Sequence, residues 1–195
     1  MRFVARTMSW IFGIPRDRTQ SSHASIICHG AALQTGFRAA LDSGHGLIGF
    51  CDADGQFEIT SFGTLLAALQ DRGADLAVGY RIARADSLKR RVMGRSWHWL
   101  SSLVLGARTA RDVDCGFKLF TRAVLVDVEP RISGGYAAVS PEILTRATSA
   151  GYTMAEAGVT HKSRSHGRQT GSDLKGVILS LVCLFRLRLT LRTEY

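Results

Sequence analysis

The stretch Leu47–Gln56, LIGFCDADGQ, decides how the chain is expected to fold. Its first five residues form an apolar run of the length of one buried strand. Asp52, Ala53, Asp54 and Gly55 follow at once as a polar turn. In an open α/β sheet, ligands gather beyond the carboxyl ends of the strands. We therefore expect a strand that brings the carboxylates of Asp52 and Asp54 to one edge of a sheet.

The segments around this stretch alternate between helical and extended patterns. Apolar spacing predicts helices over residues 30–41 and 62–72, and a second strand over residues 74–80. Helix, strand, helix and strand in this order are typical of crossover units, which indicates an α/β fold with a mostly parallel sheet flanked by helices. The same criteria predict further helices over 88–105, 141–150 and 173–184, a loop that enters a strand over 112–120, and a strand over 152–161.

Composition and charge narrow the class of protein. The 195 residues are 46% hydrophobic and 21% charged, which fits one globular domain and excludes collagen and gross disorder. The four cysteines include no C-x-x-C pair, so that neither a zinc knuckle nor a disulfide scaffold is expected. The net charge of +9 indicates a polyanionic partner: nucleic acid, phospholipid headgroups or a phosphorylated ligand. No helix-turn-helix, zinc or aromatic stacking pattern supports a nucleic-acid partner, and we expect none.

The acidic turn has the composition of a metal site. Mg²⁺ and Mn²⁺ prefer oxygen ligands, and they commonly bridge carboxylates to substrate phosphates. Asp52 and Asp54 can turn toward one cation, Gln56 supplies another oxygen, and Gly55 allows the backbone to bend. Taken alone, the same residues also fit an Asp-rich turn without a metal.

An ordered set of motifs surrounds this turn. These are GAALQTGF (30–37), DADGQ (52–56), ADLAVGYR (74–81), LKRR (88–91), DVDCGFKLF (112–120), PEILTRA (141–147) and H-x-x-R-x-x-G from His161. Together they resemble glycosyltransferase family 2, in the polyprenyl-phosphate branch typified by dolichyl-phosphate mannose synthase. The resemblance extends from about Gly30 to Gly171 and implies a Rossmann-like GT-A fold.

The resemblance implies an activity and a first group of site residues. The activity is inverting, metal-dependent transfer of a sugar from a nucleotide-diphosphate donor to a polyprenyl phosphate. Asp52, Asp54 and Gln56 are expected to hold Mg²⁺ or Mn²⁺ against the diphosphate, with Asp54 also counted as catalytic. Asp114 and Glu142 are also counted as catalytic: Asp114 is expected near the donor sugar and Glu142 at the acceptor. From the residues alone, Asp114 also fits a turn cap and Glu142 a helix-dipole partner.

A second group of site residues is basic. The resemblance implies that Arg81, Arg90 and Arg164 bind the acceptor phosphate, because arginine forks match phosphate oxygens. Gly94 departs from the family pattern, which has a hydroxyl side chain there. The open alternative for each arginine is a solvated face or an ion pair with a nearby acid.

The resemblance also divides the chain. Residues 1–29 are an atypical leader that does not match the family. Residues 30–172 are a partial GT-A domain without the first strands, so that we expect an N-terminally truncated enzyme, with a protein partner as one possible source of the missing part. Residues 173–195 form a basic amphipathic helix that suits an anionic membrane surface or packing on the domain.

The pattern predicts no membrane span and no secretory signal, so we expect a cytoplasmic protein, peripheral at the cytoplasmic face of a membrane. The alternative function is an inactive truncated remnant that binds membrane or lipid phosphate without catalysis.

Overall fold

The computed structural model describes residues 9–11, 29–52, 55–84, 88–105, 110–133, 138–162 and 174–194. Asp54 and Arg164, two of the predicted site residues, lie outside these ranges. The described elements follow one another as β1 (Ser9–Ile11), α1 (His29–Asp42), β2 (Leu47–Asp52), η1 (Ile59–Ser61), α2 (Phe62–Asp71), β3 (Leu76–Arg84), α3 (Leu88–Leu105), β4 (Phe117–Thr121), α4 (Arg122–Val128), η2 (Glu129–Arg131), α5 (Val139–Ser149), β5 (Met154–His161) and α6 (Leu174–Glu194).

The strands form one five-stranded sheet in the order β1-β2-β4-β3-β5. The α/β class is confirmed, but the expectation of a mostly parallel sheet is wrong. Among the described strands only β3 and β5 pair in parallel, whereas β1–β2, β2–β4 and β3–β4 pair antiparallel. The crossover pattern correctly indicated that β2 and β3 run in the same direction. It could not show that β4, which comes later in the chain, enters between them in the opposite direction.

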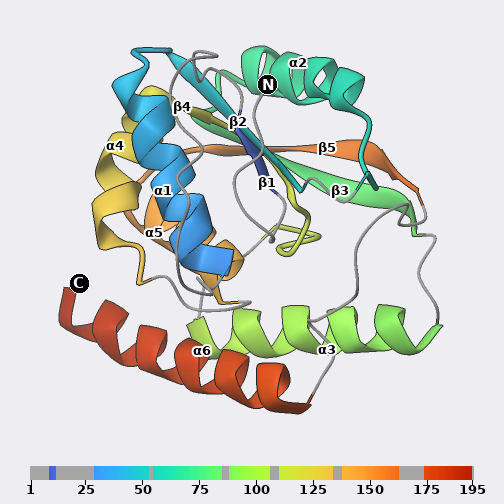
Figure 1. The fold of residues 1–195 in the computed structure, drawn as a ribbon, viewed down its shortest axis with the longest axis vertical. Helices are drawn as coiled ribbons and strands as arrows, with labels where there is room; N and C mark the ends of the chain where they lie inside the picture. Colours follow the sequence, from blue (N-terminus) through green and yellow to red (C-terminus); the bar gives the residue numbers. More distant parts are fainter. Residues whose placement is uncertain are drawn as a thin grey trace.

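Helices cover both faces of this sheet (Figure 1). On one face α1, α4 and α5 pack on alternate strand residues such as Phe50, Leu76 and Phe120. Phe37 of α1 is fully buried there, with ring centroids 6.3 Å from Phe50 and 5.8 Å from Phe120. On the other face α2 packs on the intervening strand residues. An apolar core on each face of the sheet thus fixes the strands whose ends carry the polar residues.

Helices α3 and α6 form a further layer, below the sheet in Figure 1. They pack on each other through an apolar cluster built around Leu105, Leu184, Leu187 and Leu191. The α6 helix continues to Glu194, well beyond the predicted end at residue 184. None of the helices in the described ranges combines the length and apolar content needed to cross a bilayer.

Candidate active site

Three segments converge where β2 ends. Asp52 is the last residue of β2, Arg81 lies in the second half of β3, and residues 111–116 form the turn that leads into β4. The backbone N–H of Asp52 donates to the Gly116 carbonyl at 2.8 Å. A Cβ atom on Gly116 would lie 2.0 Å from Oδ2 of Asp52. The absence of a side chain at Gly116 therefore makes room for the Asp52 carboxylate.

Arg81 is held by Asp112 of the same turn. Its Nε donates to Oδ2 and its Nη2 to Oδ1, each at 2.6 Å. Its backbone N–H also donates to Oδ2 at 3.3 Å. Burial lowers the pKa of the Arg81 guanidinium, but the hydrogen bonds and charge of Asp112 outweigh this, and the pKa lies above its usual range. The Arg81 guanidinium is therefore ionised.

Lys118 brings a buried positive charge to the same place. Only 1% of the residue is exposed, and its Nζ donates to the Cys115 carbonyl and, at 2.9 Å, to Oγ of Ser140 on α5. Burial lowers the pKa of the Lys118 ammonium, while the charges of Asp114 and Asp52 act in the opposite direction. Lys118 thus connects the turn to α5 and partly balances the acidic residues.

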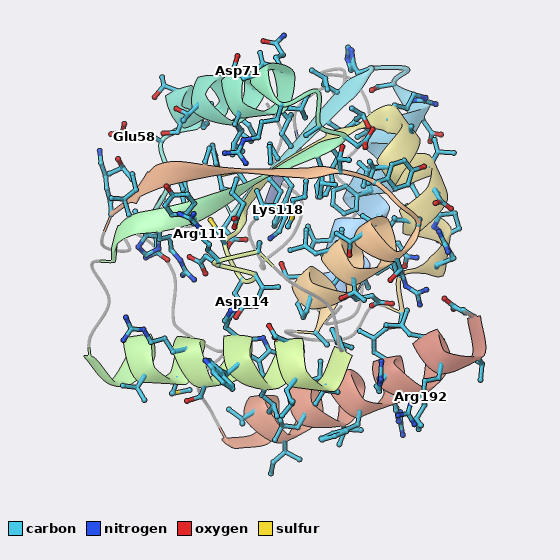
Figure 2. All side chains as sticks on the ribbon, turned by 180° about the vertical axis from the view of Figure 1, so that it is seen from behind. Glu58, Asp71, Arg111, Asp114, Lys118 and Arg192 are labelled. Carbon is cyan, nitrogen blue, oxygen red and sulfur yellow. The ribbon has the colours of Figure 1, made fainter. Side chains whose placement is uncertain are left out.

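Asp114 lies between the sheet and α3, with Lys118 nearer to the sheet (Figure 2). The indole Nε1 of Trp97 on α3 donates to its Oδ1 at 3.2 Å. The pKa of Asp114 is raised to about 6: burial and then the charge of Asp112 raise it, whereas Lys118, Arg81 and the Trp97 hydrogen bond lower it. This carboxyl group can therefore hold or release a proton near neutral pH.

Gln56, which follows the acidic turn in the sequence, is buried. Its Nε2 donates to the Lys162 carbonyl at 3.1 Å, and the Lys162 N–H donates to the Gln56 carbonyl at 2.9 Å. Gly55 has φ +76°, which confirms the predicted tight bend. These bonds tie the segment after the turn to the end of β5.

Glu142 is fully buried on α5, and its oxygens are engaged by protein groups. Oε1 accepts from the Ser133 N–H at 2.9 Å and from Nε of Arg146 at 3.1 Å, and Oε2 accepts from the Ser133 hydroxyl at 2.8 Å. Arg146 also pairs with Glu194 at the end of α6. This arrangement favours a structural role, and the placement of Glu142 at an acceptor stays a prediction.

Among the predicted site residues, the structure brings Asp52, Arg81 and Asp114 around the turn at 111–116. Arg90 belongs to α3, but its side chain is not among the described atoms. Within the described ranges no three His, Cys, Asp or Glu side chains gather as a metal would require. For the residues that are described, oxygen donors on Asp52 and Gln56 are the type that Mg²⁺ and Mn²⁺ accept.

Two residues of the cluster were missed by the sequence analysis. Asp112 and Lys118 both belong to the DVDCGFKLF motif, which was recognised, but Asp114 was selected from it. The charged lysine between apolar strand residues was a usable signal, because an unpaired lysine is seldom fully buried.

Part of the chain is similar to a known protein family. A family model described as "Glycosyl transferase family 2" matches residues 28–127, just over half of the 195 residues. The chain belongs to glycosyltransferase family 2. The family match includes β2 and β3, which carry Asp52 and Arg81, and the turn at 111–116, which carries Asp112 and Asp114. The mixed α/β structure is consistent with a partial GT-A fold.

One curated relative extends the comparison. The chain is 33% identical over 103 residues to dolichyl-phosphate beta-glucosyltransferase ALG5D of Trichomonas vaginalis. The similar region covers 48% of this chain and 30% of that relative. The chain thus spans less than a third of the length of this relative, and it resembles dolichyl-phosphate sugar transferases.

Proposed function

We propose that this family 2 protein transfers a sugar from a nucleotide-diphosphate donor to a polyprenyl phosphate. The observation that carries the proposal is the convergence of Asp52 and Arg81 on one turn, residues 111–116, which contacts both. A carboxylate beside an arginine suits a reaction in which a diphosphate leaves and a phosphate enters. Family membership and the named activity of the Trichomonas protein support the same assignment.

The donor half of the site consists of Asp52, Asp54 and Gln56, which would hold Mg²⁺ or Mn²⁺. The cation, when bound, offsets the negative charge that grows on the departing nucleoside diphosphate. Asp114 faces the donor sugar in this proposal. Inversion follows if the acceptor attacks in line from the opposite side of the anomeric carbon.

The acceptor half consists of Arg81, Arg90 and Arg164. A phosphate monoester is already an anionic nucleophile, so that these residues need to bind and orient it more than to deprotonate it. Arg81 is the member whose geometry is described, and its guanidinium is ionised and held in one orientation by Asp112. Arginine forks bind phosphate oxygens through paired hydrogen bonds.

The lipid acceptor also requires a membrane surface, and the α3–α6 layer has suitable side chains. Trp99 and Leu103 of α3 are 75% and 73% exposed, and Phe185 and Leu189 of α6 are 55% and 63% exposed. Arginines accompany them on α6, at positions 186, 188 and 192. Exposed apolar groups with basic neighbours suit the interface of an anionic leaflet. We therefore assign this layer to the cytoplasmic membrane face.

The activity is tested with the full chain, a panel of radiolabelled nucleotide sugars, a polyprenyl phosphate and Mn²⁺. We expect labelled lipid to form, and to be lost with EDTA and in the Asp52→Asn variant. Asp71→Asn, which removes an exposed carboxylate on α2, serves as the matched control and should transfer like the wild type. Lipid binding without turnover for every donor would contradict the enzyme assignment and favour a non-catalytic lipid-phosphate binder.

Membrane attachment is tested separately by sedimentation with vesicles. The wild type should bind vesicles that contain phosphatidylserine more strongly than vesicles of phosphatidylcholine alone. Phe185→Glu combined with Leu189→Glu should abolish this binding, whereas Val126→Glu, at an exposed apolar position on α4, should not. Equal loss in the control variant would contradict the assignment of the α3–α6 layer.

A further inference from the structure

Asp112 and Arg81 form the best-aligned ion pair at the candidate site. Both N–O distances are 2.6 Å, and the side chains are 7% and 13% exposed for Asp112 and Arg81, respectively. Such paired, charge-assisted bonds restrict the plane of the guanidinium as well as its position. The arginine is therefore held in one orientation before any ligand arrives.

The orientation leaves one edge of Arg81 available. A guanidinium has five N–H groups, and Asp112 accepts from the Nε group and from one of the two on Nη2. The two on Nη1 and the second on Nη2 have no protein acceptor in the described part of the chain. These N–H groups lie on the Nη1 and Nη2 edge of the guanidinium, and the spacing of the two nitrogens matches that of two phosphate oxygens.

The turn that carries Asp112 also contacts the other half of the site. The Cys115 N–H donates to the Asp112 carbonyl at 3.0 Å, and the Gly116 carbonyl accepts from the Asp52 N–H at 2.8 Å. One short turn therefore determines where Arg81 and Asp52 lie relative to each other. A movement of Asp112 would change that spacing.

The geometry points to Asp112 as a positioning residue that orients the Arg81 fork toward the acceptor phosphate. The inference rests on the proposed function, since it takes Arg81 as a contact of that phosphate. A positioning role for Asp112 and a role as a mere counter-charge to Arg81 predict opposite effects on phosphate binding. If Asp112 only opposed the positive charge of Arg81, its removal would strengthen phosphate binding, whereas loss of a positioning residue weakens it.

The test compares Asp112→Asn and Asp112→Glu with the wild type. We measure the KM for the polyprenyl phosphate, the KM for the nucleotide sugar, and the Kd for farnesyl phosphate by calorimetry. Because a hydrogen bond between charged groups is lost or displaced, we expect the acceptor KM and the Kd to rise about tenfold in both variants. The KM for the donor should stay unchanged. Asp112→Glu keeps the carboxylate but moves it by one methylene group. It therefore distinguishes an effect of the position of the carboxylate from an effect of its charge.

A control accounts for loss of a buried carboxylate that pairs with an arginine, although the side chain of this arginine, Arg38, is 62% exposed. Glu129 is 5% exposed, compared with 6% for Asp112, and its Oε1 accepts from Nε of Arg38 at 2.6 Å. Glu129→Gln should change the thermal unfolding midpoint in the manner of Asp112→Asn and leave both KM values unchanged. In an Arg81→Lys background, Asp112→Asn should have no further effect on the acceptor KM.

Two results would overturn the inference alone: unchanged or tighter phosphate binding in Asp112→Asn, or additive losses with Arg81→Lys. A wild type that neither binds farnesyl phosphate nor transfers sugar would instead overturn the proposed function, and this inference with it.

Discussion

In the described part of the chain, Arg146 is buried and Arg81 is largely buried against carboxylates, and the two pairs differ in what surrounds them. Arg146 bonds to Glu142 within α5, where Ser133 and Glu194 complete the network. Arg81 bonds to Asp112 at the end of the sheet, beside Asp114 and Lys118. The first network is closed by protein groups, whereas the second keeps donors on Arg81 that its carboxylate does not use.

The difference shows how a buried charge can be used. Burial of an ion pair is costly unless hydrogen bonds satisfy its remaining polar atoms. In the α5 network, Ser133, which follows η2, and Glu194 at the end of α6 supply those bonds. The network therefore connects α5 to the segment after η2 and to α6. At the sheet end the bonds are incomplete, so a ligand can supply the rest. The resemblance selected Glu142 as a catalytic residue, but its surroundings are those of the closed network.

The largest expected effect is the loss of Arg146. Arg146→Met leaves Glu142 buried without its cation, which should lower the free energy of unfolding by about 3–5 kcal/mol. Urea denaturation measures this loss. Arg131→Met is the control, because Arg131 pairs with Asp127 on a partly exposed surface and should lose less than about 1 kcal/mol. Equal losses in the two variants would show that the α5 network is not the closed structural element described here.

The next test removes Lys118, the lysine beside Asp114 and Asp52 at the candidate site. Lys118→Met removes the donor to Ser140 and to the Cys115 carbonyl and leaves neighbouring acids without their buried counter-charge. We expect a loss of about 1–3 kcal/mol in the free energy of unfolding, together with weaker binding of the nucleotide sugar. Lys162→Met, at an exposed ion pair with Glu58, should change neither quantity appreciably. Normal donor binding in Lys118→Met would limit Lys118 to a structural role.

A smaller change in stability but a clear change in function is expected at Gly116. The new Cβ of Gly116→Ala would lie 2.0 Å from Oδ2 of Asp52, and the flexible carboxylate can rotate away. Binding of the nucleotide sugar in Mn²⁺, measured by calorimetry, should weaken while the unfolding midpoint changes little. Gly46→Ala is the control because a Cβ there meets nothing within 4 Å. Unchanged donor binding would contradict a role for Asp52 in the donor site.

The smallest effect concerns the pH dependence of stability. The pKa of Asp114 is raised from 3.8 to about 6 by burial, so that between these values the folded protein retains a proton that the unfolded chain releases. The free energy of unfolding should therefore fall as the pH rises through this window. Asp114→Asn should flatten that slope in urea titrations from pH 4 to about 7, over the interval set by the pKa shift. Asp71→Asn should retain it, and an unchanged slope in Asp114→Asn would exclude Asp114 as its source.

Local patterns predicted many of the elements but not how they combine. The structure confirms the helices predicted over 30–41 and 62–72 and the strands predicted around Phe50 and Val78. These predictions succeeded because amphipathic spacing reflects the burial of one side of an element. The antiparallel entry of β4 between β2 and β3 was not predicted, since strand order depends on contacts between distant segments.

The candidate site follows the same division. The motif at 112–120 was found by sequence, but spacing could not decide which of two carboxylates, Asp112 or Asp114, turns toward Arg81. The location of Lys118 between apolar residues could not show that Ser140 of α5 would meet its ammonium group.

By itself the sequence determined the α/β class, the acidic turn after β2, and the resemblance to glycosyltransferase family 2, because these depend on residue types at short range. The tertiary structure alone decided which charges meet: Asp112 with Arg81, Lys118 with Ser140, and Glu142 with Arg146. The physical reason is that a buried charge is stable only beside a partner, and each of these partners comes to its place through the packing of the helices and strands that carry them.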